Sequence, residues 1–270
     1  MLIDSLSTSR TRLNSLPYQL LICLLDLTIM RQFPNGTNLR TELKKAMDRL
    51  KLSGVSYPSG YLEELVEKYY SGINYPRILM RIGEPRIRKH PYYNTILERG
   101  CDFLDCGCGT GDDIRALIKD GYPRNKIKGF DIDWNSINIG FDLYRDRESM
   151  HDIFVVSTKF PFYNETFDTV YSGNVLHTIK DRHEISVYLT NAYKVLRNGG
   201  VLFGSTLGTE GHTYIPSDDA QRTLLTENEL RHLLEGIGFI NIEIVRTGRS
   251  WKKSGGKKKS KWIHWIGMVN

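Results

Sequence analysis

The 270-residue chain has little cysteine, and the few cysteines do not follow a metal-binding pattern. Four cysteines in a chain of this length do not make a disulfide scaffold, so we expect a reducing compartment, the cytoplasm. Cys101, Cys106 and Cys108 lie close together, but their spacing lacks the C-x2-C pairs that are typical of zinc and iron–sulfur sites. The sequence therefore predicts no metal centre.

A run of apolar residues long enough to cross a membrane is also lacking. The apolar stretch Leu16–Met30 is interrupted by Asp26 and is shorter than the roughly 20 residues that a membrane-spanning helix needs. No basic segment with a small-residue cleavage site accompanies it, so it does not resemble a signal peptide. We expect a buried helix here, which either caps the rest of the chain or joins two copies in a homodimer.

Charge of one sign is only slightly in excess. The 37 Lys and Arg residues against 31 Asp and Glu residues give a net charge of +6, and 40% of the residues are apolar, as in globular proteins with a sizeable core. Much of the excess lies in one segment, which contains Lys252, Lys253, Lys257, Lys258, Lys259 and Lys261. Such a cluster suits an exposed loop, while RNA or an acidic protein stays open as a partner.

Two regions of different pattern follow one another along the chain. From Met1 to about Tyr75 the pattern is helical, as Leu39, Leu43 and Met47 illustrate by their spacing of four. After Gly100, short apolar runs alternate with longer helical patterns, which indicates βαβ units and a parallel sheet. We predict a helical cap over residues 1–75 and an α/β domain over residues 76–270. The predicted strands are Cys101–Cys106, Ile127–Ile132, Ile153–Ser157, Thr169–Ser172, Val201–Thr206, Ile240–Thr247 and Trp262–Val269, and the predicted helices are Asp112–Asp120, Ser136–Arg147, Glu184–Val195 and Glu227–Ile237.

The first predicted strand ends in a loop with glycine at every second position. Gly107, Gly109 and Gly111 let backbone amides approach a ligand at the positive end of the following helix. A dinucleotide-binding fingerprint would require glycine in place of Asp112, so this loop favours another ligand. The alternative is a tight strand-to-helix turn without a ligand.

An acidic residue, Asp131, ends the second predicted strand beside this loop. Ligands of open α/β sheets bind at the carboxyl ends of the strands, where a carboxylate can accept both hydroxyls of a ribose. The alternative roles are a helix N-cap or a solvated loop acid. Asp133 suits the ribose less well.

These motifs resemble, in order, those of the class I S-adenosylmethionine-dependent methyltransferases. The resemblance covers roughly Phe103 to Asn270 and includes the D-x-G-x-G-x-G loop, the acid after the second strand, Phe167–Val170 and Leu196–Leu202. It implies a Rossmann-like, seven-stranded, mostly parallel sheet with an antiparallel last strand, and S-adenosyl-L-methionine as the cofactor. The residues that it implies for the methionine part are Asp105, Gly107, Gly109 and Gly111, and Asp131 is implied for the ribose.

The chain departs from this family after the third predicted strand. Members usually carry an acid there that accepts a hydrogen bond from the adenine amino group, whereas this chain has Ser157 and Thr158. Either hydroxyl, or a backbone carbonyl, could accept that bond instead. We also count Asn174, which follows the fourth strand, among the candidate cofactor-binding residues.

A narrower resemblance concerns shorter strings around the first strand. Pro85–Tyr93, Ile96–Arg99 and Leu143–Arg147 look like small-molecule methyltransferases of fungal secondary metabolism, including those that esterify carboxyls of meroterpenoid intermediates. This resemblance implies a small apolar acceptor, methylated on oxygen and in some relatives at a carboxylate. The sequence after the fourth strand, Ser172–Val175, lacks the Asn/Asp-Pro-Pro-Tyr segment of enzymes that methylate the amino groups of nucleic-acid bases.

Two histidines are candidates for the chemistry. Methyl transfer needs alignment of a nucleophile, and a phenol or alcohol benefits from a general base, whereas a carboxylate is already ionised. His177 and His212 follow the fourth and fifth strands, but each could instead be a packed histidine. Further acceptor-pocket candidates, which could equally be core residues, are Tyr69, Tyr70, Arg86, His90 and Tyr92. The remaining alternatives are a methyltransferase fold without methyl transfer, such as a pericyclase, isomerase or regulatory binder, and an RNA or protein methyltransferase.

Overall fold

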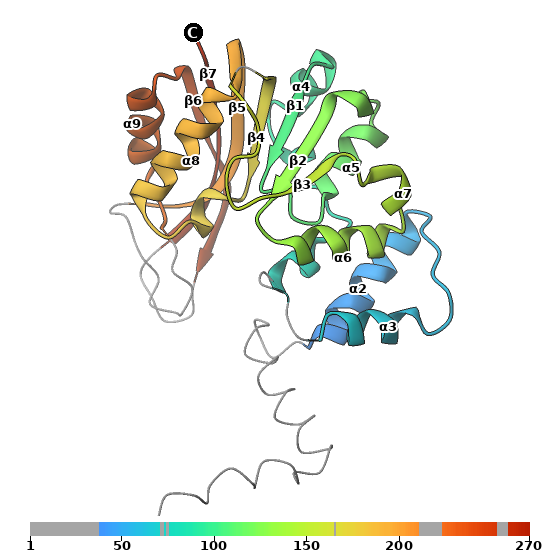
Figure 1. The fold of residues 1–270 in the computed structure, drawn as a ribbon. Coiled ribbons are helices and arrows are strands. Elements are labelled where there is room, and N and C mark those ends of the chain that lie inside the picture. Colours follow the sequence, from blue (N-terminus) through green and yellow to red (C-terminus); the bar gives the residue numbers. More distant parts are fainter. Residues whose placement is uncertain (1–37, 71–72, 74–75, 165, 211–222, 253–258) are drawn as a thin grey trace, which may run out of the picture.

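The computed structural model describes residues 38–70, 73, 76–164, 166–210, 223–252 and 259–270 (Figure 1). The stretch Leu16–Met30, the candidate His212, and Lys257 with Lys258 lie outside these described residues. Within them, no helix is long and apolar enough to cross a membrane, and no group of three side chains could hold a metal ion.

Seven strands form one sheet in the order β3-β2-β1-β4-β5-β7-β6. All neighbouring strands are parallel except that β7 runs antiparallel to both β5 and β6. The prediction of a mostly parallel seven-stranded sheet with a reversed last strand is therefore confirmed. The strands are β1 Phe103–Cys106, β2 Ile127–Asp131, β3 Phe154–Val156, β4 Phe167–Gly173, β5 Leu196–Thr209, β6 Ile240–Lys252 and β7 Lys259–Met268.

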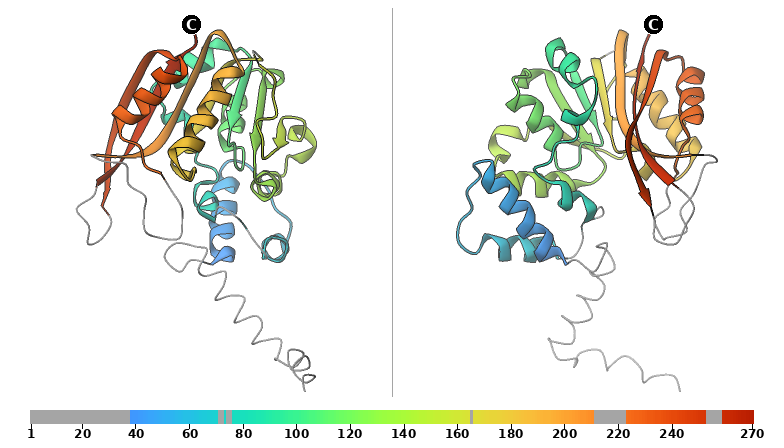
Figure 2. Two further views of the ribbon diagram at one scale, coloured as in Figure 1. Left: turned by 60° about the vertical axis from the view of Figure 1, so that its left-hand side comes forward. Right: turned by 180° about the vertical axis from the view of Figure 1, so that it is seen from behind.

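Helices cover both faces of the sheet (Figure 2). The helices that follow β1 in the chain are α5 Asp112–Lys119, α6 Trp134–Tyr144, α7 Arg147–Met150, α8 Arg182–Lys194 and α9 Glu227–Ile237, and those before it are α2 Leu39–Leu52, α3 Tyr61–Lys68 and α4 Tyr93–Arg99. Successive strand side chains point to opposite faces. Leu104 thus joins the core under α8 and α9, whereas Phe103 joins the core with α4, α5 and α6.

One predicted helix ends earlier than its pattern indicated. The pattern predicted a single helix over Ser136–Arg147, but α6 ends at Tyr144, and Arg145 adopts the left-handed conformation with φ of 56°. A residue in that conformation stops the helical hydrogen-bond ladder, so α7 starts anew at Arg147.

The N-terminal helices α2 and α3 pack against α6. Their buried side chains form a third core with Ile139 and Leu143 of α6. Tyrosine hydroxyls reinforce this contact at the end of α6, because Tyr61 donates to the Asp142 carbonyl at 3.0 Å and Tyr69 donates to its carboxylate at 2.6 Å. Figure 1 places these helices below the ends of β1 and β2, at the carboxyl edge of the sheet. The domain boundary at residue 75 stays a prediction.

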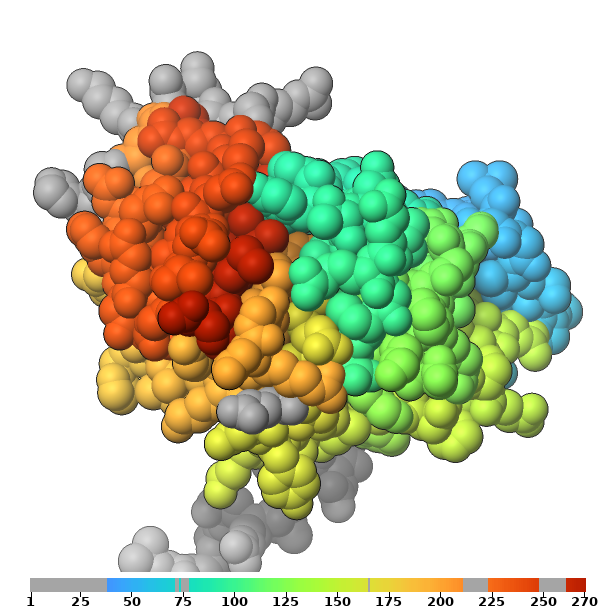
Figure 3. All heavy atoms as spheres, turned by 90° about the horizontal axis from the view of Figure 1, so that it is seen from above, coloured from blue at the N-terminus to red at the C-terminus, as the bar shows by residue number. Residues whose placement is uncertain are grey.

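The opposite edge of the sheet is seen in Figure 3, where the end of β7 lies beside the start of β5. At this edge the guanidinium of Arg197 bridges Asp102 and Asp168, at 2.9 and 2.8 Å. The charges of Arg197, Asp102 and Asp168 are therefore paired with one another. We look for the functional site at the carboxyl edge, where the candidate residues lie.

Candidate functional site

The glycine loop between β1 and α5 has a backbone that only glycine adopts easily. Gly107, Gly109 and Gly111 have φ values of 76°, 55° and 74°, in the left-handed region. The amides of Gly107 and Cys108 donate to the Phe130 carbonyl at 2.9 and 3.1 Å, which holds the loop against β2. The loop is therefore a rigid turn that joins the carboxyl ends of β1 and β2.

The space that Gly107 and Gly109 leave open is occupied by the tips of apolar side chains. A Cβ atom on Gly109 would lie 2.5 Å from Cδ1 of Ile78, and one on Gly107 would lie closer than 3.0 Å to Cγ2 of Val175. Ile78 comes from the helical turn Pro76–Arg81, before the first strand. These are flexible side-chain ends rather than backbone, so a bound ligand can displace them.

Asp131 stands at the end of β2 with its carboxylate against the glycine loop. One oxygen accepts a hydrogen bond from the Gly109 amide at 2.8 Å, and the other accepts from the Asp133 amide at 2.9 Å. Burial is the main reason why the pKa of Asp131 is raised. Asp133 instead caps α6, since its carboxylate accepts from the amide and hydroxyl of Ser136. The geometry thus separates the two acids and leaves Asp131 at the crevice.

Asp105, the acid before the glycine loop, is a buried carboxyl group without a partner. It is 2% exposed and makes no hydrogen bond or ion pair with any residue that the structure describes. Burial and the nearby carboxylates of Asp113 and Asp131 raise its pKa. Buried carboxyl groups in folded proteins are nearly always hydrogen-bonded. This site therefore suits a ligand that brings a cationic donor, such as an ammonium group.

The two acids that follow the glycine loop hold the chain segment that precedes β1. Asp112 accepts hydrogen bonds from the Gly83 amide and the Tyr144 hydroxyl, both at 2.6 Å. Asp113 accepts from the amides of Arg86 at 2.6 Å and Ile87 at 2.9 Å. Sequence reasoning missed this role. Its only signal was a pair of adjacent carboxylates in the first turn of a helix.

The region expected to hold adenine lies beyond Asp131, at the end of β3. The Ser157 amide donates to the Asp131 carbonyl at 3.0 Å, and the Ser157 hydroxyl accepts from the Lys159 amide at 3.2 Å. Thr158 is exposed. Two large apolar side chains that the sequence did not single out, Ile132 and Trp134, are each 54% exposed beside Asp131. The expected strand included Ile132, but β2 ends one residue earlier, so Ile132 lies in the connection to α6.

Asn174 follows β4 in a left-handed conformation. Its φ is 63°, its amide donates to the Ser205 carbonyl at 2.8 Å, and its side-chain oxygen lies 3.5 Å from the Ser205 hydroxyl. The side-chain nitrogen is buried and has no partner among the described residues. Asparagine adopts this conformation more readily than most other non-glycine residues. The candidate Asn174 therefore presents an unused hydrogen-bond donor at the carboxyl edge.

His177 is held by the part of β5 that extends beyond the end of β4. Its Nδ1 accepts a hydrogen bond from the Leu207 amide at 3.3 Å and lies 3.3 Å from the Thr206 hydroxyl. Because a backbone N–H can only donate, the neutral ring carries its proton on Nε2. The hydrogen bond gives His177 a structural partner, and base catalysis by this residue stays a prediction.

Three of the N-terminal candidates are engaged in packing contacts. Tyr69 is bound to Asp142, and the Tyr92 hydroxyl donates to Glu243. His90 is 4% exposed, its Nε2 lies 3.0 Å from the Gly204 carbonyl, and its Nδ1 accepts from the Tyr92 amide at 3.3 Å. Burial and the ring of His264 lower the pKa of His90 to about 4. Tyr69 and His90 therefore belong to the core, whereas Tyr92 is half-buried and is bound to Glu243 at the surface.

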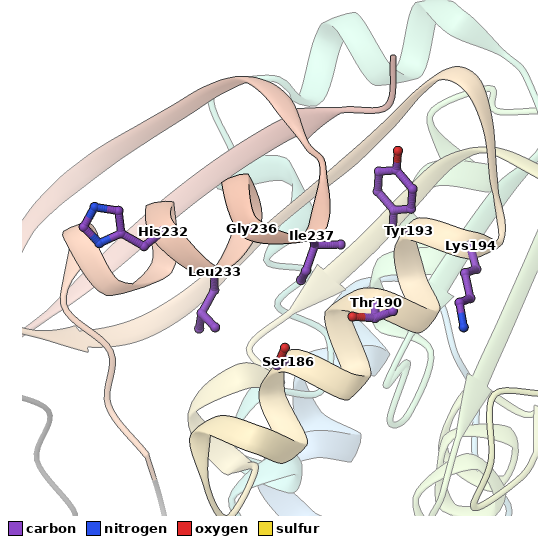
Figure 4. A pocket seen from close by; sticks show the side chains of 8 residues that line it. All are labelled: Ser186, Thr190, Tyr193, Lys194, His232, Leu233, Gly236 and Ile237. Atoms are coloured by element: carbon purple, nitrogen blue, oxygen red, sulfur yellow. The ribbon is translucent and has the colours of Figure 1, made fainter.

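A separate groove of about 550 Å³ lies between α8 and α9 (Figure 4). None of the candidate residues lines it. In Figure 4, Leu233 and Ile237 of α9 lie opposite Ser186 and Thr190 of α8. The groove follows from helix packing, because Gly236 leaves open space where another residue would carry a side chain.

Comparison with known proteins finds methyltransferases. The family model described as a methyltransferase domain matches residues 104–204. The chain is 29% identical over 191 residues to the O-methyltransferase atr3 of Stereocaulon alpinum, and the aligned region covers 62% of this chain and 51% of that protein. It is 39% identical over 72 residues to the methyltransferase ausD of Penicillium brasilianum, which covers 26% of each. The aligned part thus spans about half of the first relative and a quarter of the second.

The fold has counterparts among solved structures. A SAM-dependent methyltransferase of Methanosarcina mazei superposes with a TM-score of 0.51 at 18% sequence identity, over 67% of this chain and 98% of that one. At this level of identity the similarity concerns the fold, and the residues of the site have to be argued from their own geometry.

Proposed function

We propose that this chain, which carries a methyltransferase domain with the fold of the S-adenosylmethionine-dependent methyltransferases, transfers a methyl group to an oxygen of a small apolar metabolite. The observation that carries the proposal is the glycine loop with two buried carboxyl groups, Asp105 and Asp131, at the carboxyl edge inside the matched segment. Relatives named as O-methyltransferases support oxygen as the acceptor atom.

The residues fit the proposed cofactor by their chemistry. Gly107, Gly109 and Gly111 supply a surface without Cβ atoms for the methionine part, and Asp105 supplies an unpaired carboxyl group for its ammonium. Asp131 would accept hydrogen bonds from the ribose hydroxyls. These bonds would either replace its present hydrogen bond from the Gly109 amide or form in addition to it. The adenine would lie towards Ser157 and Thr158, with Ile132 as an apolar contact. When bound, the cofactor supplies an electrophilic methyl group on a sulfonium.

The rest of the machinery would align the acceptor and exclude water. The segment that carries Ile78 is fastened to α5 by Asp112 and Asp113, so it can cover the glycine loop as an apolar lid. His177 lies at the same carboxyl edge, with its Nδ1 bonded to the Leu207 amide, and it stays the candidate residue for contact with the acceptor. An acceptor that is ionised at neutral pH, such as a carboxylate, requires no more than this.

Two further features remain predictions of the same proposal. The stretch Leu16–Met30 would cover the site or join two copies in a homodimer. The few cysteines, three of which lie without disulfide bonds in the structure, agree with a reducing compartment such as the cytoplasm.

Calorimetric titration tests the cofactor assignment. The wild-type chain should bind S-adenosylhomocysteine and should not bind NAD. Asp131→Ala should lower the affinity by about 10- to 150-fold, since a hydrogen bond to a charged group contributes about 1.5–3 kcal/mol. Asp152→Ala is the matched control, because Asp152 is an exposed acid paired with Arg124. Binding of NAD, or equal affinity in the Asp131 variant, would overturn the assignment.

Turnover distinguishes the transferase from a fold that has lost methyl transfer. The departure at Ser157 and Thr158 is the feature that favours the second function, a pericyclase, isomerase or regulatory binder. We expect S-adenosylhomocysteine to form when the chain is incubated with its cofactor and a panel of apolar carboxylic acids and phenols. Cofactor binding without product across the panel and across cell extracts would favour the second function.

A salt series separates the small-molecule acceptor from a nucleic acid. Each phosphate contact releases counterions, so methyl transfer to RNA would fall steeply between low and moderate salt. Transfer to an apolar acceptor in a closed pocket should change little, and neutralising Lys257, Lys258 and Lys259 together should leave it unchanged. A joint loss of activity with salt and with the lysines would favour a polyanionic substrate.

A further inference from the structure

Charged groups of both signs surround the hydroxyl of Tyr171, a fully buried residue of β4. Asp105 is its direct neighbour across the β1–β4 pairing. The carboxylates of Asp113 and Asp105 raise the pKa of Tyr171, while the guanidinium of Arg86 lowers it. The Tyr171 hydroxyl also lies over Gly173, where a Cβ atom would be 2.5 Å away. A guanidinium and two carboxyl groups therefore share one region at the foot of the glycine loop.

The guanidinium of Arg86 has no hydrogen-bond acceptor and no ion pair among the residues that the structure describes. Burial is the main influence on the pKa of Arg86 and lowers it, while the more distant carboxylates of Asp113 and Asp112 act in the opposite direction. Other arginines of the same surroundings are paired: Arg88 binds Asp120 through two hydrogen bonds, and Arg115 binds Asp146 in the same way. A partly buried guanidinium whose N–H groups have no acceptor among the described residues is suited to an anionic ligand that supplies one.

The backbone places Arg86 beside the loop. Its amide donates to Asp113 at 2.6 Å, and Asp113 lies in the first turn of α5, two residues after Gly111. From the other side, Asn174 brings its unused buried amide nitrogen to the end of β4, next to Ser205, which pairs with Gly173. Three elements thus bring together a guanidinium, an amide donor and the unpaired carboxyl group of Asp105.

This set is complementary to the zwitterion of an α-amino acid. We propose that Arg86, assisted by the side-chain amide of Asn174, binds the α-carboxylate of the methionine part of the cofactor, while Asp105 binds its α-ammonium. The inference rests on the proposed function. It moves Arg86 from the acceptor pocket, where the sequence suggested it, to the cofactor. It also explains why the segment before β1 is fastened to α5 at Arg86 itself.

A pair of ligands that differ only in the carboxylate tests the inference. S-adenosylhomocysteine has both charged groups, and its decarboxylated analogue, S-adenosyl-3-thiopropylamine, keeps the amine alone. Neither can donate a methyl group, so calorimetry measures binding without turnover. The wild-type chain should bind S-adenosylhomocysteine at least about 30-fold more tightly than the analogue, as expected for lost hydrogen bonds between charged groups.

Arg86→Gln should remove this discrimination selectively. We expect the variant to bind S-adenosylhomocysteine no more tightly than it binds the analogue. Its affinity for the analogue should stay within about threefold of the wild-type value, and this retained binding also shows that the variant is folded. Arg88→Gln is the matched control and should keep the wild-type ratio, since Arg88 is exposed and paired with Asp120.

The outcomes separate the two levels of the argument. The role of Arg86 is overturned if the wild-type chain binds the two ligands equally well, or if Arg86→Gln prefers S-adenosylhomocysteine as strongly as the wild-type chain does. In both cases the proposed function stands. Failure of the wild-type chain to bind either ligand overturns the proposed function, and the role of Arg86 with it.

Discussion

Glycine serves opposite purposes on the two sides of β4. In the loop after β1, Gly107 and Gly109 have left-handed backbones, and the atoms above them are side-chain tips of Val175 and Ile78. In β5, Gly204 lies against the Ser172 carbonyl and the ring of Trp265. A Cβ atom on Gly204 would lie 2.8 Å from Cζ2 of that ring. The first arrangement preserves space that a ligand can claim, and the second removes space so that backbone and core can pack closely.

Buried polar atoms without a described partner lie on both sides of β4. Asp105 and Asn174, beside the glycine loop and β4, have polar atoms without described partners. His90, which packs against β5, uses both ring nitrogens, with Gly204 and Tyr92 as partners. The buried Nδ1 of His264 and Nε1 of Trp265, in β7 beside β5, also have no partner among the described residues. We place the ligand at the carboxyl edge because the open polar groups of Asp105 and Asn174 lie there, beside the glycine loop.

The strongest test of the close-packed side is Gly204→Ala. The new methyl group would collide with the Ser172 carbonyl, which belongs to the neighbouring strand and cannot move aside without breaking the β4–β5 pairing. We expect a loss of about 3 kcal/mol or more in the free energy of unfolding, measured by urea denaturation. A loss under about 1 kcal/mol would contradict the view that this glycine is needed for packing.

The buried His90 should make the same side sensitive to acid. The pKa of His90 in the folded chain is about 4, below the ordinary value of 6.5. Between pH 6.5 and pH 4 the unfolded chain therefore binds a proton at this residue, whereas the folded chain does not. Stability should therefore fall as the pH drops from about 6.5 to 4, by about 3 kcal/mol in total, and should be unaffected above pH 7.

The variant His90→Gln isolates this contribution. Asp113, whose pKa is raised to about 6, acts in the opposite direction and becomes less destabilising as the pH falls. It is present in both proteins, so the difference between their unfolding free energies, followed by denaturation from pH 7.5 to 4, reports on His90. A difference that does not change with pH would show that His90 is not buried as a neutral ring.

Gly109→Ala should affect binding far more than stability. The left-handed backbone costs alanine about 1–2 kcal/mol, and the tip of Ile78 can move aside. The affinity for S-adenosylhomocysteine should nevertheless fall more than tenfold, because the methyl group fills the space reserved for the methionine part. Thermal unfolding and calorimetry on the same sample measure the two effects. Retained affinity would mean that the loop is only a tight turn.

The smallest effect should come from Gly236→Ala in the groove between α8 and α9. No atom lies within 4 Å of the position that the Cβ would occupy, and the residue is helical. The substitution should raise the free energy of unfolding by about 0.5–1 kcal/mol, since glycine is a poor helix former. A destabilised variant would indicate that the open space at Gly236 has a role of its own.

The sequence predicted the elements better than their ends. The helix Glu227–Ile237 agrees at both ends, because Thr226 and Glu229 form a capping box and Gly238 ends the helix, signals that are local. The strand predicted over Val201–Thr206 extends instead over Leu196–Thr209, because Leu196 pairs with Phe167 of β4 at its start and β7 pairs with it as far as Thr209 at its end. Strand length depends on a distant partner, which periodicity does not contain.

The sequence by itself determined the glycine loop, the acids Asp105 and Asp131 beside it, and the alternation that makes a parallel sheet, since these depend on local backbone preference and on the spacing of apolar residues. Only the tertiary structure decided which polar groups have partners. Asp113 meets the amide of Arg86 across 27 residues of chain, and His177 meets Leu207 across 30. Burial and register set such pairings, so the groups that remain unpaired, and hence ready for a ligand, emerge only when the chain is folded.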